Sequence, residues 1–468
     1  MEGLLFNRIE KFQNRIAFID ENEKKIRYKD IISISNNISK IIDSGSLTLL
    51  ITRNKYSCFA IYIGLIRCNS VILFQDEFYT SLGIKKLIKE YIPDFIVCSI
   101  EEKNKFTQYE FIFNEDDYCI LKSKKKFFHN IHKDLSLLLP TSGSTSSPKM
   151  VRLSNSNLLS NTKSIIKSLN INRNDRTITT MPLSYSYGLS IINTHLYRGS
   201  SIVINQYSVL ERNFWKLLDK YKVNNFGGVP YFYEMLDKIK FHKMHLPSLR
   251  YITQAGGKMN LNLSKKLVKI CEEKKIIMYF MYGQTEATAR ISYLPWDKAK
   301  SKVSSIGIPI PKGKMWLIDN KGKKIKQKLK KGDLIYKGKN VCLGYSNNYK
   351  DLSKGDLNKG ILVTGDVAKQ DEDDFFYIIG RKKRFLKIFG YRINLDEIEK
   401  YISKKGIECA CTGEDNNLRI FIKKTNKNTN INKILLSIFS KNIKDYKIYF
   451  VNEIPRNHAG KINYSKLK

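Results

Sequence analysis

The sequence predicts an α/β protein with more than one domain, and three observations lead to this prediction. The chain has 468 residues, more than one hydrophobic core usually holds. Helix-like and strand-like segments alternate through its middle part. A basic run at residues 381–384 then separates the body from the remaining residues. With 42% hydrophobic residues, the composition is that of a globular protein rather than a disordered one.

The alternation begins near residue 211 and predicts a parallel sheet covered by helices. The expected helices are 214–221, 231–239 and 263–272, and the expected short apolar strands are 223–228, 251–255 and 276–281. Strand-rich sequence with glycine turns follows from 304 to 377. The last part is expected to be a small α+β unit with helices at 395–403 and 434–443. We therefore set the domain boundary within the basic run.

A hydroxyl-rich segment at residues 141–149 contains one glycine and ends in a lysine. Apolar runs at 137–139 and 150–153 flank it, so it is expected to join two strands. A tight turn at Gly143 would direct amides and hydroxyls toward anionic oxygens, and Lys149 would add a positive charge. A Walker A loop is excluded, because that motif has a fixed spacing and precedes a helix. Composition alone equally allows a solvated hairpin.

Further motifs follow in a fixed order. They are Tyr282-Gly283-Gln284-Thr285-Glu286, Thr364-Gly365-Asp366, Gly380-Arg381 and Gly460-Lys461. This series resembles the adenylate-forming superfamily of acyl-CoA synthetases, adenylation domains and firefly luciferase, over nearly the whole chain. The resemblance implies a large N-terminal AMP-binding domain, residues 1–382, of packed α/β sheets plus a distorted β-barrel. It also implies a small mobile α+β C-terminal domain, residues 383–468, after a hinge at Lys383, where many relatives have aspartate.

The resemblance assigns a set of residues to ATP and Mg²⁺. These are Thr141, Ser142, Gly143, Ser144, Thr145 and Lys149 at the phosphates, Gly256, Gly257, Tyr282 and Gly283 at the adenine, Thr285 at the α-phosphate, and Asp366 and Arg381 at the ribose. Glu286, with Thr145, would hold Mg²⁺, because a hard cation prefers oxygen ligands. One carboxylate, that of Asp366, can accept hydrogen bonds from both ribose hydroxyls. Ser146 stands where the family usually has a second glycine.

Two C-terminal segments also resemble motifs of the superfamily. Residues 455–461 resemble the terminal motif whose lysine, here Lys461, bridges the substrate carboxylate and the phosphate. The flexible stem of lysine can bring a positive charge between two anions that repel each other. Residues 387–393 resemble the segment that lines the thiol tunnel, where Gly390 would let pantetheine approach the backbone. The expected catalytic residues are Lys461, Glu286, Thr285 and Thr141.

The segment 182–189 matches the acyl pocket of the superfamily. The expected pocket residues are Tyr185, Tyr187, Gly188 and Gly228. Many acyl-CoA synthetases have histidine where Tyr185 stands. Adenylation domains that activate amino acids usually have an aspartate here, which pairs with the ammonium group, and this segment contains none. The sequence therefore favours a carboxylic acid without an α-amine.

The predicted reaction is ATP-dependent activation of a carboxylic acid to an acyl-adenylate, with release of pyrophosphate, followed by transfer to a thiol. CoA is the expected acceptor, as in the acyl-CoA ligases of fatty acid metabolism. The phosphopantetheine of an acidic acyl or peptidyl carrier protein remains an alternative. A noncatalytic polyanion-binding protein is the alternative from another class, because the net charge is +38. The lysines are spread from end to end, which argues against nucleic acid as the partner.

The sequence shows none of the features of an exported or membrane-spanning protein. Its first residues lack the pattern of a secretory signal, and the longest apolar stretch, 58–66, is too short to span a bilayer. The eight cysteines are scattered and are expected to be reduced core residues. We therefore expect a cytoplasmic protein with no membrane span.

Overall fold

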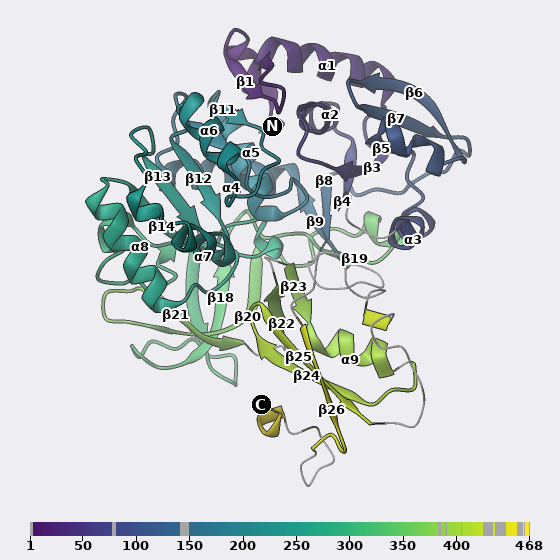
Figure 1. The fold of residues 1–468 in the computed structure, drawn as a ribbon. Coiled ribbons are helices and arrows are strands. Elements are labelled where there is room, and N and C mark those ends of the chain that lie inside the picture. Colours follow the sequence, from purple (N-terminus) through teal and green to yellow (C-terminus); the bar gives the residue numbers. More distant parts are fainter. Residues whose placement is uncertain are drawn as a thin grey trace.

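The computed structural model describes residues 3–76, 81–140, 149–381, 385–388, 391–403, 405–424, 434–435, 446–455, 462 and 464–467. Within them, two large mixed sheets form the body, and a four-stranded sheet and smaller C-terminal sheets follow (Figure 1). The expected α/β class, with a large N-terminal and a small C-terminal part, is confirmed.

One large sheet has eight strands in the described residues. In spatial order these are β19 (Gly344–Ser346), β9 (Met150–Ser154), β8 (Leu135–Pro140), β4 (Val71–Asp76), β3 (Leu47–Thr52), β5 (Phe95–Ser99), β7 (Tyr118–Ser123) and β6 (Tyr109–Glu115). Strands β8, β4, β3 and β5 are parallel, and β9 is antiparallel to β8, with Pro140 opposite Met150. Residues 141–148 therefore connect two neighbouring strands, as the sequence predicted.

The other large sheet has nine strands in the described part of the chain. In order these are β16 (Ile308–Pro309), β15 (Ser292–Tyr293), β14 (Ile277–Tyr282), β13 (Tyr251–Gln254), β12 (Asn225–Gly228), β10 (Arg176–Ile178), β11 (Ser201–Val203), β1 (Ile16–Ile19) and β2 (Lys25–Arg27). From β14 to β1 all neighbours are parallel. The predicted alternation is confirmed, and the carboxyl ends of β12, β13 and β14 lie at one edge of the sheet.

The helices of the body cover these two sheets. Their bounds are α1 (Tyr28–Ile41), α2 (Tyr56–Arg67), α3 (Ser81–Tyr91), α4 (Asn155–Leu169), α5 (Ser186–Arg198), α6 (Arg212–Lys220), α7 (Pro230–Lys238) and α8 (Leu261–Glu273). None of the helices in the part of the chain that the structure describes combines the length and apolar character needed to cross a bilayer.

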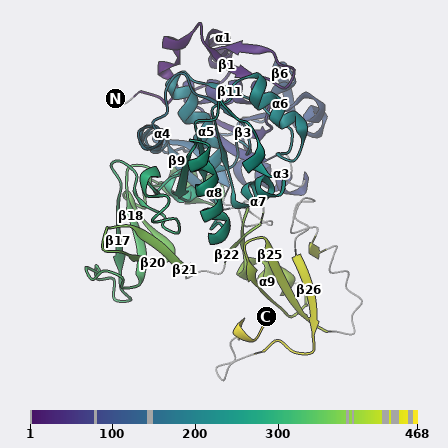
Figure 2. The ribbon, with the colours of Figure 1, turned by 60° about the vertical axis from the view of Figure 1, so that its left-hand side comes forward.

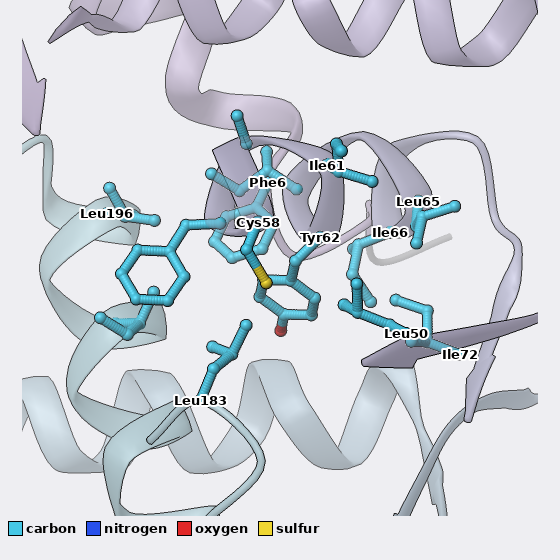
Figure 3. Close-up of a cluster of buried hydrophobic side chains, with 14 of the residues drawn as sticks. Phe6, Leu50, Cys58, Ile61, Tyr62, Leu65, Ile66, Ile72, Leu183 and Leu196 are labelled. Carbon is cyan, nitrogen blue, oxygen red and sulfur yellow. The ribbon is translucent and has the colours of Figure 1, made fainter. Parts of the chain in front are cut away.

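Helix α2 is apolar all round because it is buried on every side. Its residues 56–66 are all buried, and they include 58–66, the longest apolar stretch of the sequence. Figure 3 shows Cys58, Tyr62 and Ile66 of α2 among side chains from β3, β4 and α5. The Tyr62 hydroxyl donates to Asn193 Oδ1 at 3.0 Å, which satisfies its polar end. This cluster fixes α5, whose N-terminus carries the predicted acyl-pocket residues.

The region expected as a distorted barrel contains a four-stranded antiparallel sheet. Its strands are β17 (Lys314–Ile318), β18 (Gly332–Lys337), β20 (Ile361–Gln370) and β21 (Phe376–Arg381). Along the first half of β20, exposed and buried residues alternate, as the two-residue period of a strand requires. Thr364 and Asp366 fall on the inward face. The period of the strand therefore directs the predicted ribose-binding carboxylate into the protein.

The C-terminal part has a hydrophobic core of its own, formed by residues such as Ile393, Ile402 and Ile420. Its elements are β22 (Phe385–Ile388), β23 (Tyr391–Asn394), α9 (Leu395–Ser403), β24 (Cys409–Glu414), β25 (Asn417–Lys423) and β26 (Tyr446–Val451). Figures 1 and 2 both show these strands at the end of the molecule opposite α1. A separate core is typical of a domain. The predicted helix at 395–403 is confirmed, whereas most of 434–443 lies outside the described residues.

All eight cysteines are free thiols, and all except Cys68 are buried. The expectation of reduced core cysteines is therefore confirmed. Cys98 and Cys119 face each other across β5 and β7, with their Sγ atoms 3.8 Å apart.

Candidate functional site

The predicted adenine and magnesium segments lie side by side at one edge of the nine-stranded sheet. Gly228 ends β12 opposite Gln254 of β13, and Gln254 lies opposite Phe280 of β14. The chain continues from these strands into Gly256 and Gly257 on one side and residues 283–286 on the other. Parallel pairing thus places three predicted segments at the position where open α/β sheets bind ligands.

Two of the predicted glycines are required by the backbone. Gly256 has φ of +86°, and a Cβ atom there would lie 2.7 Å from the Tyr185 hydroxyl oxygen. A Cβ atom on Gly283 would lie 1.8 Å from the carbonyl oxygen of Ala289. Neither position accepts a side chain. The predicted pocket residue Tyr185 therefore lies directly beside the predicted adenine loop.

The predicted adenine and ribose residues contact each other. The Tyr282 hydroxyl donates a hydrogen bond to Asp366 Oδ2, and the Asp366 amide donates to the Thr364 hydroxyl at 3.1 Å. Asp366 is only 3% exposed. In the pairing of β20 with β21, Asp366 lies opposite Arg381. Residues far apart in the sequence thus meet, and a carboxylate lies where it could accept hydrogen bonds from a sugar beside an aromatic ring.

A second set of contacts joins Lys149 to Glu286 through Tyr345. The Tyr345 hydroxyl donates to Glu286 Oε1 at 2.9 Å, and Lys149 Nζ lies 3.8 Å from the centroid of the Tyr345 ring. Tyr345 lies on β19, opposite Val151 of β9, so it borders the strand that follows the predicted phosphate loop. A cation and a buried carboxylate therefore occupy neighbouring positions beside this loop.

Glu286 fits the predicted magnesium role by its chemistry. It is 6% exposed, and the backbone around it is fixed, because its carbonyl oxygen accepts the Cys342 amide at 2.9 Å. Mg²⁺ commonly takes one or two protein carboxylates and completes its coordination with phosphate and water. One glutamate close to the strand that follows the predicted phosphate loop meets this requirement.

We predict that Tyr345→Phe raises the Mg²⁺ concentration needed for half-maximal activity. The ring beneath Lys149 is kept, but Glu286 loses the donor that orients its carboxylate. Loss of such an outer contact typically weakens metal affinity roughly tenfold or more. Titrating Mg²⁺ in a pyrophosphate-exchange assay measures the effect. Tyr109→Phe, which removes a hydroxyl that donates to the Pro93 carbonyl, is the control. An unchanged Mg²⁺ requirement would contradict the role of Tyr345.

The predicted acyl-pocket residues occupy different positions. Tyr187 lines a small cavity of about 20 Å³, and its hydroxyl lies 2.7 Å from Thr253 Oγ1. Burial raises the pKa of Tyr187 to about 12, so the hydroxyl stays neutral. Gly228 lines a larger pocket of about 490 Å³ with Tyr231 and Phe232. Gly188 lines neither of these two spaces, and a Cβ atom there would lie 2.3 Å from the Pro182 carbonyl oxygen.

Thr285 lies just beyond β14 in a short 3₁₀ turn, Thr285–Ala287. Its Oγ1 is 3.3 Å from the Ser186 hydroxyl at the start of α5. The predicted α-phosphate contact and the predicted acyl-pocket segment are therefore in direct contact, as attack of an acid on the α-phosphorus would require.

The sequence analysis missed Arg290, which the structure places beside Gly283 and the Tyr187 ring. After Glu286 the chain reverses through a strained γ-turn at Thr288, with φ 66° and ψ −59°, and the Ala289 amide donates to the Ala287 carbonyl at 2.7 Å. The reversal brings the Arg290 backbone against Gly283. One signal was present in the sequence, namely an arginine between two apolar residues, Ala289 and Ile291. Both of these neighbours are buried in the structure.

Some predicted residues lie outside the described part of the chain. These are Thr141, Ser142, Gly143, Ser144 and Thr145 of the phosphate loop, the hinge residue Lys383, the tunnel residue Gly390 and the catalytic Lys461. For Arg381 only the backbone pairing is described. Their roles stay predictions.

Comparison with known proteins supplies an independent line of evidence. A family model described as AMP-binding enzyme matches residues 5–346. The "Probable 4-coumarate--CoA ligase 2" of Dictyostelium discoideum is 29% identical over 76% of this chain and 66% of that protein. The 2-succinylbenzoate–CoA ligase of Geobacillus sp. (strain WCH70) is 23% identical over 97% of this chain and 94% of that protein.

A solved structure of o-succinylbenzoate CoA synthetase from Bacillus subtilis, bound to a product analogue, has the same fold. Its TM-score is 0.81 at 19% sequence identity, and the match covers 99% of this chain and 97% of that one. The chain spans slightly less than two thirds of the coumarate ligase that it matches.

Proposed function

Because this chain belongs to the family of AMP-binding enzymes, we propose that it activates a carboxylic acid with ATP and transfers the acyl group to a thiol. The observation that carries the proposal is the meeting of Tyr282 with Asp366, and of Lys149 with Glu286 through Tyr345, around one sheet edge. These contacts provide an aromatic ring and a carboxylate for a nucleoside, and a cation and a carboxylate for phosphates and Mg²⁺.

In the first half-reaction, a carboxylate oxygen of the acid attacks the α-phosphorus of ATP. The bond from that phosphorus to the bridging oxygen breaks, and pyrophosphate leaves with the electron pair. Bound Mg²⁺ would offset the negative charge of the phosphates. Lys461 would supply a positive charge between the two reacting anions, and Thr285 would contact the α-phosphate. The product is an acyl-adenylate, a mixed anhydride that must be shielded from water.

In the second half-reaction, a thiolate sulfur attacks the acyl carbonyl carbon. The carbon–sulfur bond forms, the bond to the phosphate oxygen breaks, and AMP leaves. We propose that residues 383–468 act as a separate domain that turns about Lys383 between the two steps. This turn would withdraw Lys461 and bring Gly390 to the thiol channel.

We propose CoA as the acceptor, in the cytoplasm, where ATP and CoA are both available. The near full-length match to a CoA ligase supports CoA. The phosphopantetheine of an acidic carrier protein is the other candidate acceptor, because the net charge of +38 would attract either partner.

A pyrophosphate-exchange screen over aryl, short-chain, hydroxy, dicarboxylic and long-chain acids tests the proposal. We expect Mg²⁺-dependent exchange with one class of acid, and long-chain acids test the link to fatty acid metabolism. Thioester formation with CoA and with a phosphopantetheinylated carrier protein then identifies the acceptor. The proposal is wrong if no acid supports exchange, and salt-dependent retention of nucleic acid would then favour a polyanion-binding protein.

A further inference from the structure

Arg290 is a buried cation that has no counterion within the described part of the chain. It is only 2% exposed, and among the described residues its guanidinium forms no ion pair and its Nε has no hydrogen-bond partner. The guanidinium lies over the Tyr187 ring, with Arg290 Cζ 4.8 Å from the ring centroid. Burial lowers the pKa of Arg290, but arginine stays protonated in proteins. A buried charge without a partner is costly, so a bound anion would stabilise it.

The guanidinium lines the small cavity that Tyr187 also borders. The cavity measures about 20 Å³, roughly the room of one water molecule. Ser190, Asn225 and Thr253 add polar groups to its wall, and the described residues of the lining include no aspartate or glutamate. The other titratable side chains in this lining are neutral at physiological pH, because burial lowers the pKa of His195 and raises the pKa values of Tyr187 and Tyr251. Arg290 thus sets the electrostatic character of this cavity, which favours an anion.

Arg290 is held firmly at this position. Its carbonyl oxygen accepts Asn161 Nδ2 at 3.0 Å, and its amide donates to Asn161 Oδ1 at 3.3 Å. The Tyr185 ring lies 6.5 Å from the Tyr187 ring, centroid to centroid, and the Tyr185 hydroxyl lies beside Gly256. Contacts through Tyr185 and Tyr187 therefore link the predicted nucleotide loop at Gly256 to the guanidinium of Arg290. A substrate that passes them would have one end at the nucleotide and the other at Arg290.

We propose that Arg290 binds a second carboxylate of the acid substrate, so that the enzyme acts on short dicarboxylic acids. This inference rests on the proposed function. A guanidinium donates charge-assisted hydrogen bonds to a carboxylate. The cavity has room for about one water-sized atom, so one carboxylate oxygen would fill it, and an alkyl tail or an aromatic ring would not fit. The carboxylate at the opposite end would react with ATP.

Acids of equal length, with and without a second carboxylate, test the inference. We expect the wild-type kcat/KM for pyrophosphate exchange to be at least about 100-fold higher with succinate than with butyrate, and higher with glutarate than with pentanoate. Arg290→Met keeps the volume but removes the charge, and should lower the succinate-to-butyrate ratio by about 100-fold. Arg290→Lys keeps a charge without the planar fork, and should give an intermediate ratio.

Arg198→Met is the matched control. Arg198 lies on α5 like Tyr187, but its Nε donates to the Ile171 carbonyl and it does not line the cavity. Its succinate-to-butyrate ratio should equal that of the wild type. Thermal melting and ATP binding show whether each variant is folded. Calorimetric titration of succinate into protein saturated with a nonhydrolysable ATP analogue gives a second measurement, and Arg290→Met should abolish this binding.

The two proposals can fail separately. Equal exchange with mono- and dicarboxylic acids, or a ratio that Arg290→Met leaves unchanged, overturns the inference while acid activation stands. If no acid supports exchange, the proposed function fails and the titration decides about the site. Succinate binding that Arg290→Met abolishes would support an anion site, and no binding to the wild type would refute it.

Discussion

Replacing Lys461 with alanine is expected to abolish formation of the acyl-adenylate while largely sparing capture of a supplied adenylate by the thiol. The attacking carboxylate and the α-phosphate are both anions, and the ammonium group of Lys461 is the cation expected between them. Removing one such stabilising group typically costs a factor of roughly 100 to 1000 in rate. Pyrophosphate exchange measures the first half-reaction, and thioester formation from synthetic acyl-adenylate measures the second.

Lys466→Ala provides the control for this experiment, because Lys466 is an exposed lysine close to Lys461 in the sequence. It should leave both half-reactions unchanged. An equal loss of both half-reactions in Lys461→Ala would refute the assigned role. Such a result would mean that Lys461 supports the C-terminal domain as a whole rather than the adenylation step.

The second large effect is expected for Asp366→Asn, which should weaken ATP binding by roughly 10- to 100-fold, because hydrogen bonds to a charged group contribute about 1.5 to 3 kcal/mol. Asparagine has the same shape, so the buried position between Tyr282 and Thr364 is kept. The substitution removes the carboxylate that would accept both ribose hydroxyls. Calorimetric titration with ATP measures the dissociation constant.

Dideoxy-ATP, which lacks both ribose hydroxyls, shows whether the loss occurs at the sugar. The wild type should bind ATP much more tightly than dideoxy-ATP, whereas Asp366→Asn should bind the two almost equally. Asp356→Asn is the control, because Asp356 is an exposed residue that accepts backbone amides in a surface turn. If Asp366→Asn still discriminates between the two nucleotides, the carboxylate does not contact the ribose.

Helices and strands with a clear apolar periodicity could be predicted from the sequence. The apolar strands at 251–255 and 276–281 correspond to β13 and β14, and the helix at 263–272 corresponds to α8. The helix at 395–403 has the bounds that the sequence indicated. In these segments the periodicity of apolar residues coincides with the buried face, so tertiary contacts reinforce the local preference.

Residues that reach the site through long-range pairing could not be found in this way. Tyr345 contacts Glu286 because β19 pairs with β9, and no local pattern encodes that register. Arg290 depends on a γ-turn at Thr288, where a β-branched residue adopts positive φ. Such turns are usually predicted from glycine or asparagine, and this one has neither. Strand pairing and this turn, which appear in the three-dimensional fold, connect both residues to the predicted motifs.

The path of residues 341–355 limits how this protein can be recombined with its relatives. Besides the contact through Tyr345, the Leu343 amide donates to the Arg152 carbonyl, and the fully buried Arg152 guanidinium donates to the Asp351 carbonyl at 2.9 Å. A chimaera joined near residue 300 would take this stretch from one parent and β9 and Glu286 from the other. Crossover points for domain exchange are therefore better set after residue 355, so that one parent supplies all of these interlocking pieces.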